Sequence, residues 1–102
     1  MFLLNSLLNN SSLGFPNADG VIEVSSSPYT APENGYVIAT AKSGSTFDNT
    51  EYVYGNINGI VFAISGSRSV NNTQWLPIKQ GQVLTFTKAS NNSTVHFYPL
   101  LK

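Results

Sequence analysis

The C-terminal stretch "LPIKQGQVLTFTKASNNSTVHFYPLLK" (76–102) predicts two strands joined by a polar turn. Side chains alternate between the two faces of a strand, so Leu84 and Phe86 share one face and Val83 takes the other. In the second strand Phe97 and Tyr98 point to opposite faces in the same way. An antiparallel sheet usually has one buried face and one wet face. Apolar side chains on both faces therefore call for a second covering surface.

The rest of the chain continues this pattern of short apolar segments and polar turns. Strands are expected at 21–26, 36–42, 50–55, 59–65, 69–78, 83–88 and 94–101, and "PYTAPENG" (28–35) is expected to be a turn-rich link. Neither an internal repeat nor a helix of domain-building length interrupts them. This spacing predicts an all-β fold, an antiparallel jelly-roll β-sandwich of roughly eight strands. The 102 residues suffice for one domain, which we expect at 21–102 behind an N-terminal segment at 1–20.

Two of the expected strands are apolar on both faces. In "GIVFAI" (59–64) Val61 and Phe62 point to opposite faces of the strand. In "YVIATA" (36–41) Val37 and Ile38 do the same. No crossover helices are expected that would make these strands part of a parallel sheet. A second subunit in closed symmetry is another way to keep water off the outer face, although single apolar residues are also tolerated beside water. The subunit-interface residues expected on this basis are Val37, Ala39, Val61 and Ala63.

The N-terminal segment carries an apolar cluster that differs from the strands. Its members are spaced as in a short helix, and they are Phe2, Leu3, Leu4, Leu7 and Leu8. Two interpretations stay open: a segment that docks into a neighbouring protein, or a terminus that is disordered or lies as a strap on its own domain. Asn5 and Ser6 interrupt the apolar run and no positive charge precedes it, so we expect no secretory signal here.

The composition argues against several functions. Only 10% of residues are charged and the formal net charge is zero, so the sequence contains no basic patch for nucleic acid and no cationic stretch for a membrane surface. The chain has no cysteine, which suits synthesis in a reducing cytosol. We therefore expect neither a nucleic-acid partner nor membrane insertion.

Catalytic chemistry has little support. His96 is the only histidine, and the five acidic residues are scattered along the chain. No phosphate-binding glycine loop or nucleophile motif is present. Asp48 and Glu51 flank "NT" and would suit calcium, but an exposed loop is the favoured interpretation. We expect no enzyme, no cofactor and no metal.

Binding is the better-supported class of function. Trp75 is the only tryptophan and lies in "NNTQW". An aromatic platform flanked by amides is typical of sugar-binding sites. Tyr52 and Tyr54 share a strand face and form a second such patch. Alternatively, Trp75 packs in the core or in a subunit contact and the two tyrosines pack inside the sheet. The ligand-binding candidates are Trp75, Asn71, Asn72, Gln74, Tyr52 and Tyr54.

Three segments resemble a known group of proteins. "YTAPENGYV" (29–37), "LPIKQGQVLTF" (76–86) and "VHFYPLLK" (95–102) are similar to segments of phage tail-fibre head domains, and the layout of 28–102 resembles the trimeric jelly rolls of the C1q and tumour-necrosis-factor type. The resemblance implies a homotrimeric head domain, here called the knob, made in the bacterial cytoplasm and displayed on the virion surface. It would attach the particle to a host-surface glycan or protein and dock on another virion protein through residues 1–20.

The resemblance has one departure that keeps other functions open. Residues 1–20 are too few for the shaft of a long tail fibre. A capsid-decorating or head-fibre protein is therefore the main alternative to a tail-fibre tip. A stand-alone carbohydrate-binding module is a third possibility.

Overall fold

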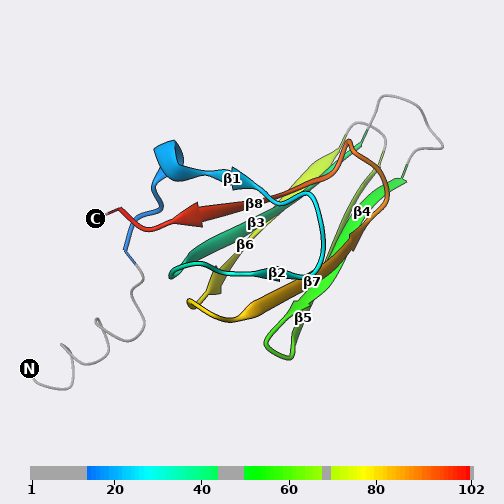
Figure 1. The fold of residues 1–102 in the computed structure, drawn as a ribbon. Helices are drawn as coiled ribbons and strands as arrows, with labels where there is room; N and C mark the ends of the chain where they lie inside the picture. The colour runs from blue at the N-terminus through cyan, green and yellow to red at the C-terminus, as the bar shows by residue number, and fades with distance from the viewer. Residues whose placement is uncertain (1–13, 44–49, 68–69, 102) are drawn as a thin grey trace, which may run out of the picture.

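The computed structural model describes residues 14–43, 50–67 and 70–101. These residues form two antiparallel sheets of four strands each that face one another (Figure 1), as expected for a β-sandwich. A short 3-10 turn, η1 (Ala18–Gly20), precedes the strands. The strands are β1 (Ile22–Glu23), β2 (Tyr29–Thr30), β3 (Gly35–Lys42), β4 (Thr50–Ile57), β5 (Ile60–Ser67), β6 (Asn71–Ile78), β7 (Val83–Lys88) and β8 (Thr94–Pro99).

The strand order confirms the predicted jelly roll. One sheet has the order β1-β8-β3-β6 and the other β2-β7-β4-β5. The pairs β1–β8, β2–β7, β3–β6 and β4–β5 are all antiparallel. The chain is thus a long antiparallel hairpin rolled up so that alternate pairs fall in different sheets. The strand β2 lies within the segment expected to be a link. It was not predicted as a strand, because two paired residues between prolines give too short a pattern to recognise.

The core lies between the two sheets and follows the alternation of the sequence. Leu84, Val95 and Phe97 are fully buried, whereas Val83 and Tyr98 point outward from the same strands. The Tyr29 ring packs near Phe97 with 6.0 Å between ring centroids. Burial raises the pKa of the Tyr29 phenol.

The structure corrects part of the predicted subunit interface. Val37 and Ala39 are fully buried and belong to the core between the sheets of one chain, so their side chains present no surface to a second copy. The prediction for these two residues is wrong, because their side chains lie on the inward face of β3. The opposite face of "YVIATA" (36–41) does not need a second subunit to cover Ile38, since that residue is only 7% exposed within the single chain. Val61 and Ala63, in contrast, are exposed.

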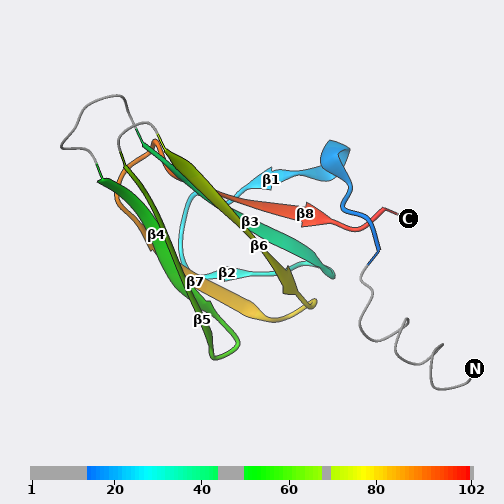
Figure 2. The same ribbon diagram turned by 180° about the vertical axis from the view of Figure 1, so that it is seen from behind.

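Residues 14–20 pack against the end of β8. The backbone N–H of Asn17 donates to the carbonyl of Pro99 at 2.7 Å, and that of Leu101 donates to the carbonyl of Phe15 at 2.9 Å. Residues 14–20 and the end of β8 lie at the same end of the sandwich in both views (Figures 1 and 2). Among the described residues, contacts with the sandwich are thus present from residue 14 onward, seven residues before the expected start of the domain at 21. The expected docking residues Phe2, Leu3, Leu4, Leu7 and Leu8 lie outside the described residues.

Candidate functional site

An aromatic platform covers the outer face of the sheet β1-β8-β3-β6. Ile38 lies in the middle strand of three, paired with Trp75 of β6 on one side and with His96 of β8 on the other. The Trp75 and Tyr98 rings come from the two strands that flank β3 and stand 6.0 Å apart between centroids. Both therefore reach over β3, which explains why Ile38 is nearly buried on an outward face. We call Tyr36, Trp75 and Tyr98 the aromatic platform.

The rings of the platform support one another. Trp75 and Tyr98 are stacked with 29° between their planes, and Tyr36 meets Trp75 edge-on with centroids 5.8 Å apart. His96 extends the group, with its ring 6.5 Å from that of Tyr98. Such aromatic pairs contribute about 0.5–1.5 kcal/mol beyond the area they bury. Trp75 nevertheless remains 51% exposed, so the platform is held in place and also open to a ligand.

The amides expected to accompany Trp75 are not beside it. Asn72 and Gln74 project from the opposite side of β6, as strand alternation requires, and the Asn72 amide nitrogen donates to the carbonyl of Ser65 on β5. Asn71 shares the face of Trp75 but lies at the far end of the strand, where its Oδ1 accepts from the N–H of Ser43 at 3.0 Å. These three side chains thus do not assemble with the indole.

Sequence reasoning missed Tyr36 and Tyr98 as neighbours of Trp75. Alternation puts Tyr36 on the face opposite Val37 and Tyr98 on the face opposite Phe97, but it does not say which face is outward. What the sequence does not reveal is that β6 and β8 both pair with β3, which brings residues 36, 75 and 98 together.

The outer face of the other sheet has a different character. Tyr52 and Tyr54 of β4 stack with centroids 5.6 Å apart and 21° between planes, so their expected common face is confirmed. Both are exposed, not packed inside the sheet. None of the described side chains pointing outward from this sheet is charged. We call this surface the uncharged face; it comprises Thr30, Tyr52, Tyr54, Asn56, Val61, Ala63, Ser65, Val83, Thr85 and Thr87.

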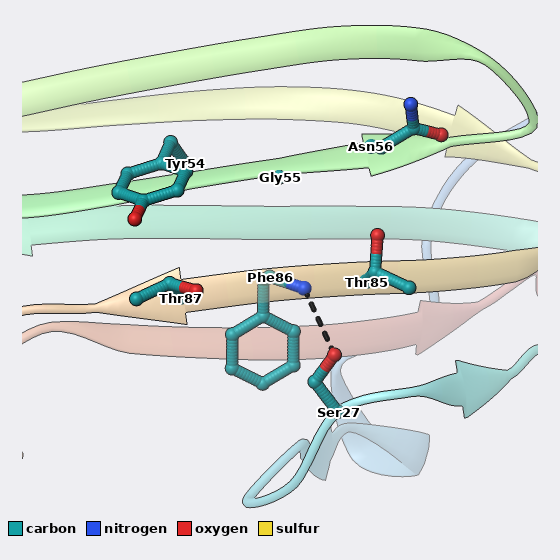
Figure 3. A pocket seen from close by; sticks show the side chains of 7 residues that line it. All are labelled: Ser27, Tyr54, Gly55, Asn56, Thr85, Phe86 and Thr87. Carbon is teal, nitrogen blue, oxygen red and sulfur yellow. Dashed lines mark hydrogen bonds between the residues drawn. The ribbon is translucent and has the colours of Figure 1, made fainter.

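A shallow depression of about 390 Å³ lies beside Tyr54 on the uncharged face, between β4 and β7 (Figure 3). Two polar side chains that line it are already engaged within the fold. Asn56 Oδ1 accepts from the N–H of Gly59 at 2.8 Å, and Ser27 Oγ accepts from the N–H of Phe86 at 3.0 Å. The depression is therefore a less suitable ligand site than the platform, which presents an open indole.

The strand β5 forms the edge of the uncharged face. It is the last strand of its sheet, and its eight residues, "IVFAISGS", include neither a charge nor a proline. Val61 is 74% exposed. Edge strands of soluble proteins are usually protected from pairing by charges, prolines or covering segments. On β5 the described part of this chain supplies neither a charge nor a proline, although the Asn72 amide of β6 occupies the Ser65 carbonyl.

Metal and membrane sites find no support in the residues described. Over 14–43, 50–67 and 70–101, no three His, Cys, Asp or Glu side chains are grouped as a metal site would need. In the same ranges no helix has the length and hydrophobicity needed to cross a bilayer. Glu51 is buried among serine hydroxyls, and Asp48 lies outside the described residues.

Comparison of the chain with family models, with curated proteins and with solved structures finds no match.

Proposed function

We propose that this chain is a structural protein of a bacteriophage virion, a homotrimeric jelly-roll knob that mediates attachment to the host surface. Residues 1–20 would dock it on another virion protein of the tail or capsid. The jelly-roll strand order and the three segments similar to phage fibre heads support this assignment. The main alternative within the same class is a capsid-decorating or head-fibre protein.

The observation that carries the proposal is the uncharged face with its edge strand β5, which has neither a charged residue nor a proline. Val61 and Ala63 remain exposed there, as the interface prediction requires. A surface without charged side chains can meet its own copy without like-charge repulsion, and it offers a charged partner no ion pair. A second copy of this chain is therefore the occupant that suits it.

Val61→Asp tests the assembly. Light scattering of the full chain at micromolar concentration should give a mass about three times the 11.0 kDa of one chain. An aspartate at 61 would be buried without a partner at each contact, which costs several kcal/mol, so the variant should be a folded monomer with the circular dichroism spectrum of the wild type. Val70→Asp is the matched control, because Val70 is an exposed valine outside the uncharged face and its variant should stay trimeric. A folded wild-type monomer would contradict the proposal.

The position of the protein on an intact particle separates the rival functions. Labelling with an antibody and imaging the particles should place it at the tail tip for a fibre head and on the capsid face or vertex for a decorating protein. Its absence from purified particles would contradict both functions.

The platform favours a second candidate, a stand-alone carbohydrate-binding module. Trp75 is open to solvent on a rigid sheet face, which suits a sugar ring. Saturable glycan binding by an isolated monomer that particles lack would favour this function over the knob.

A further inference from the structure

The aromatic platform is pre-organised on a regular sheet. Trp75 sits in the interior of β6 and rests against Tyr98 and Tyr36. The Tyr36 hydroxyl donates to the carbonyl of Gly14 at 3.1 Å, which fixes that ring at its far end. A ligand would therefore meet side chains already held in place, and little conformational entropy is lost on binding.

The chemistry of the platform selects a ligand with one apolar face and a polar rim. The indole ring offers a flat surface with negative charge density, which suits the C–H groups on one face of a pyranose. Polar groups border the ring. Thr73 and Thr40, whose hydroxyls lie 3.3 Å apart, form the next cross-strand pair along the sheet, and the His96 imidazole lies beyond Tyr98. These groups can exchange hydrogen bonds with sugar hydroxyls.

The charges on this sheet favour a neutral ligand over an anionic one. Lys42 is the only lysine or arginine on its four strands, and it pairs with Asn71 at the end of β3, two pairs beyond Thr40. Glu23 pairs with His96 and adds a negative charge at the near rim. A phosphate, a sulfate or a sialic acid would find no cluster of cations here.

We propose that the aromatic platform binds a neutral saccharide, with one sugar ring flat against Trp75. The inference rests on the proposed function, because it names the class of host-surface ligand that the knob would recognise. The uncharged face on the opposite sheet then serves contact between copies, and the two faces have separate roles.

The single tryptophan gives a direct assay. Trp75 is the only tryptophan of the chain, so fluorescence of the full-length protein excited beyond the tyrosine absorption band reports on the platform. Titration with maltotetraose, cellotetraose and chitotetraose should give a saturable change in emission with at least one of them, together with protection from acrylamide quenching. Sialyllactose should bind at least tenfold more weakly than that sugar.

Variants assign the signal to the platform. Calorimetry should show at least a tenfold loss of affinity for the bound tetrasaccharide in Trp75→Ala and a smaller loss in Trp75→Phe. Val70→Ala is the control, since Val70 is 56% exposed and lies outside both the platform and the uncharged face, and its truncation should leave saccharide affinity unchanged.

Three outcomes would overturn the inference. The first is that the wild-type protein binds none of these neutral sugars saturably, and the second is that Trp75→Ala binds the sugar as tightly as the wild type. The third is that Trp75→Ala converts the assembly to monomers, which would make the platform a contact between copies. The proposed function fails separately, when the wild-type protein is a monomer or is absent from particles.

Discussion

Glu51 shows at the scale of one residue how a buried carboxylate organises a loop. Its side chain is 6% exposed. Ser93 Oγ donates to Oε1 at 2.8 Å, and Ser90 Oγ lies 2.9 Å from both carboxylate oxygens. Ser90 Oγ in turn accepts from the N–H of Asn92 at 3.1 Å. The turn between β7 and β8 is thus built around one acidic side chain, for which the sequence favoured an exposed loop over a calcium site.

Replacing Glu51 should destabilise the sandwich. Glu51→Ala leaves the fully buried Ser93 hydroxyl without its acceptor and removes charge-assisted bonds, so we expect a loss of about 2–3 kcal/mol in the free energy of unfolding. Glu51→Gln keeps one oxygen acceptor and should lose less. Urea denaturation followed by circular dichroism measures both, with Glu23→Ala at an exposed site as the control within about 0.5 kcal/mol. Equal stability of Glu51→Ala and the wild type would show that the carboxylate does not hold the loop.

Trp75 marks the limit of sequence reasoning at this scale. Its type and its uniqueness indicated a binding residue, but its partners were sought among sequence neighbours. Alternation sends Gln74 to the other side of β6, and the true neighbours Tyr36 and Tyr98 come from strands that only the register brings together. The sequence shows which residues share a strand face. It does not show which face is outward or which strand pairs with which.

At the scale of elements, the hairpin between β4 and β5 shows what a short motif determines. Asn58 and Gly59 both have positive φ, at 50° and 89°, and Ile57 pairs directly with Ile60. This is the two-residue hairpin that Asn-Gly favours. The turn implied between the strands expected at 50–55 and 59–65 is therefore found there, at residues 58 and 59. The short strand β1 lies within the strand expected at 21–26, whereas β2 was not expected, because two residues carry almost no periodic signal.

The hairpin yields a prediction at the same scale. Asn58→Ala/Gly59→Ala puts a Cβ on residue 59 in the left-handed region, which costs about 1–2 kcal/mol, and replaces Asn58, a residue type that tolerates this region, with one that does not. For a chain of this size we expect the melting temperature to fall by about 8 °C or more. Asn58→Gly is the control and should lower it by far less, since glycine adopts positive φ readily. Differential scanning calorimetry gives both values. A double alanine variant as stable as the wild type would mean that the conformation of this turn does not stabilise the hairpin.

At the scale of the whole molecule, the jelly roll joins the ends of the described chain. The strand β1 pairs with β8, and the N–H of Val24, a buried residue, donates to the carbonyl of Val95 at 2.8 Å. The predicted strands were enough to indicate the class of fold. The boundary of the domain could not be predicted from the sequence, because "GFPNADG" (14–20) has the composition of a turn. Its bonds to Pro99 and Leu101 form only in the closed sandwich.

These contacts predict where the chain can be shortened. Removing residues 1–13 leaves every contact described above in place, so we expect this variant to stay folded and trimeric. Removing residues 1–24 deletes β1 and the buried Val24 and exposes the edge of β8, a loss of at least ~3 kcal/mol and more than about 10 °C. If residues 1–13 carry the docking segment, phage grown with the shorter deletion should lack the protein on their particles although it is folded and trimeric in the lysate. Particles that carry it at the wild-type level would show that the virion contact is made by the sandwich itself.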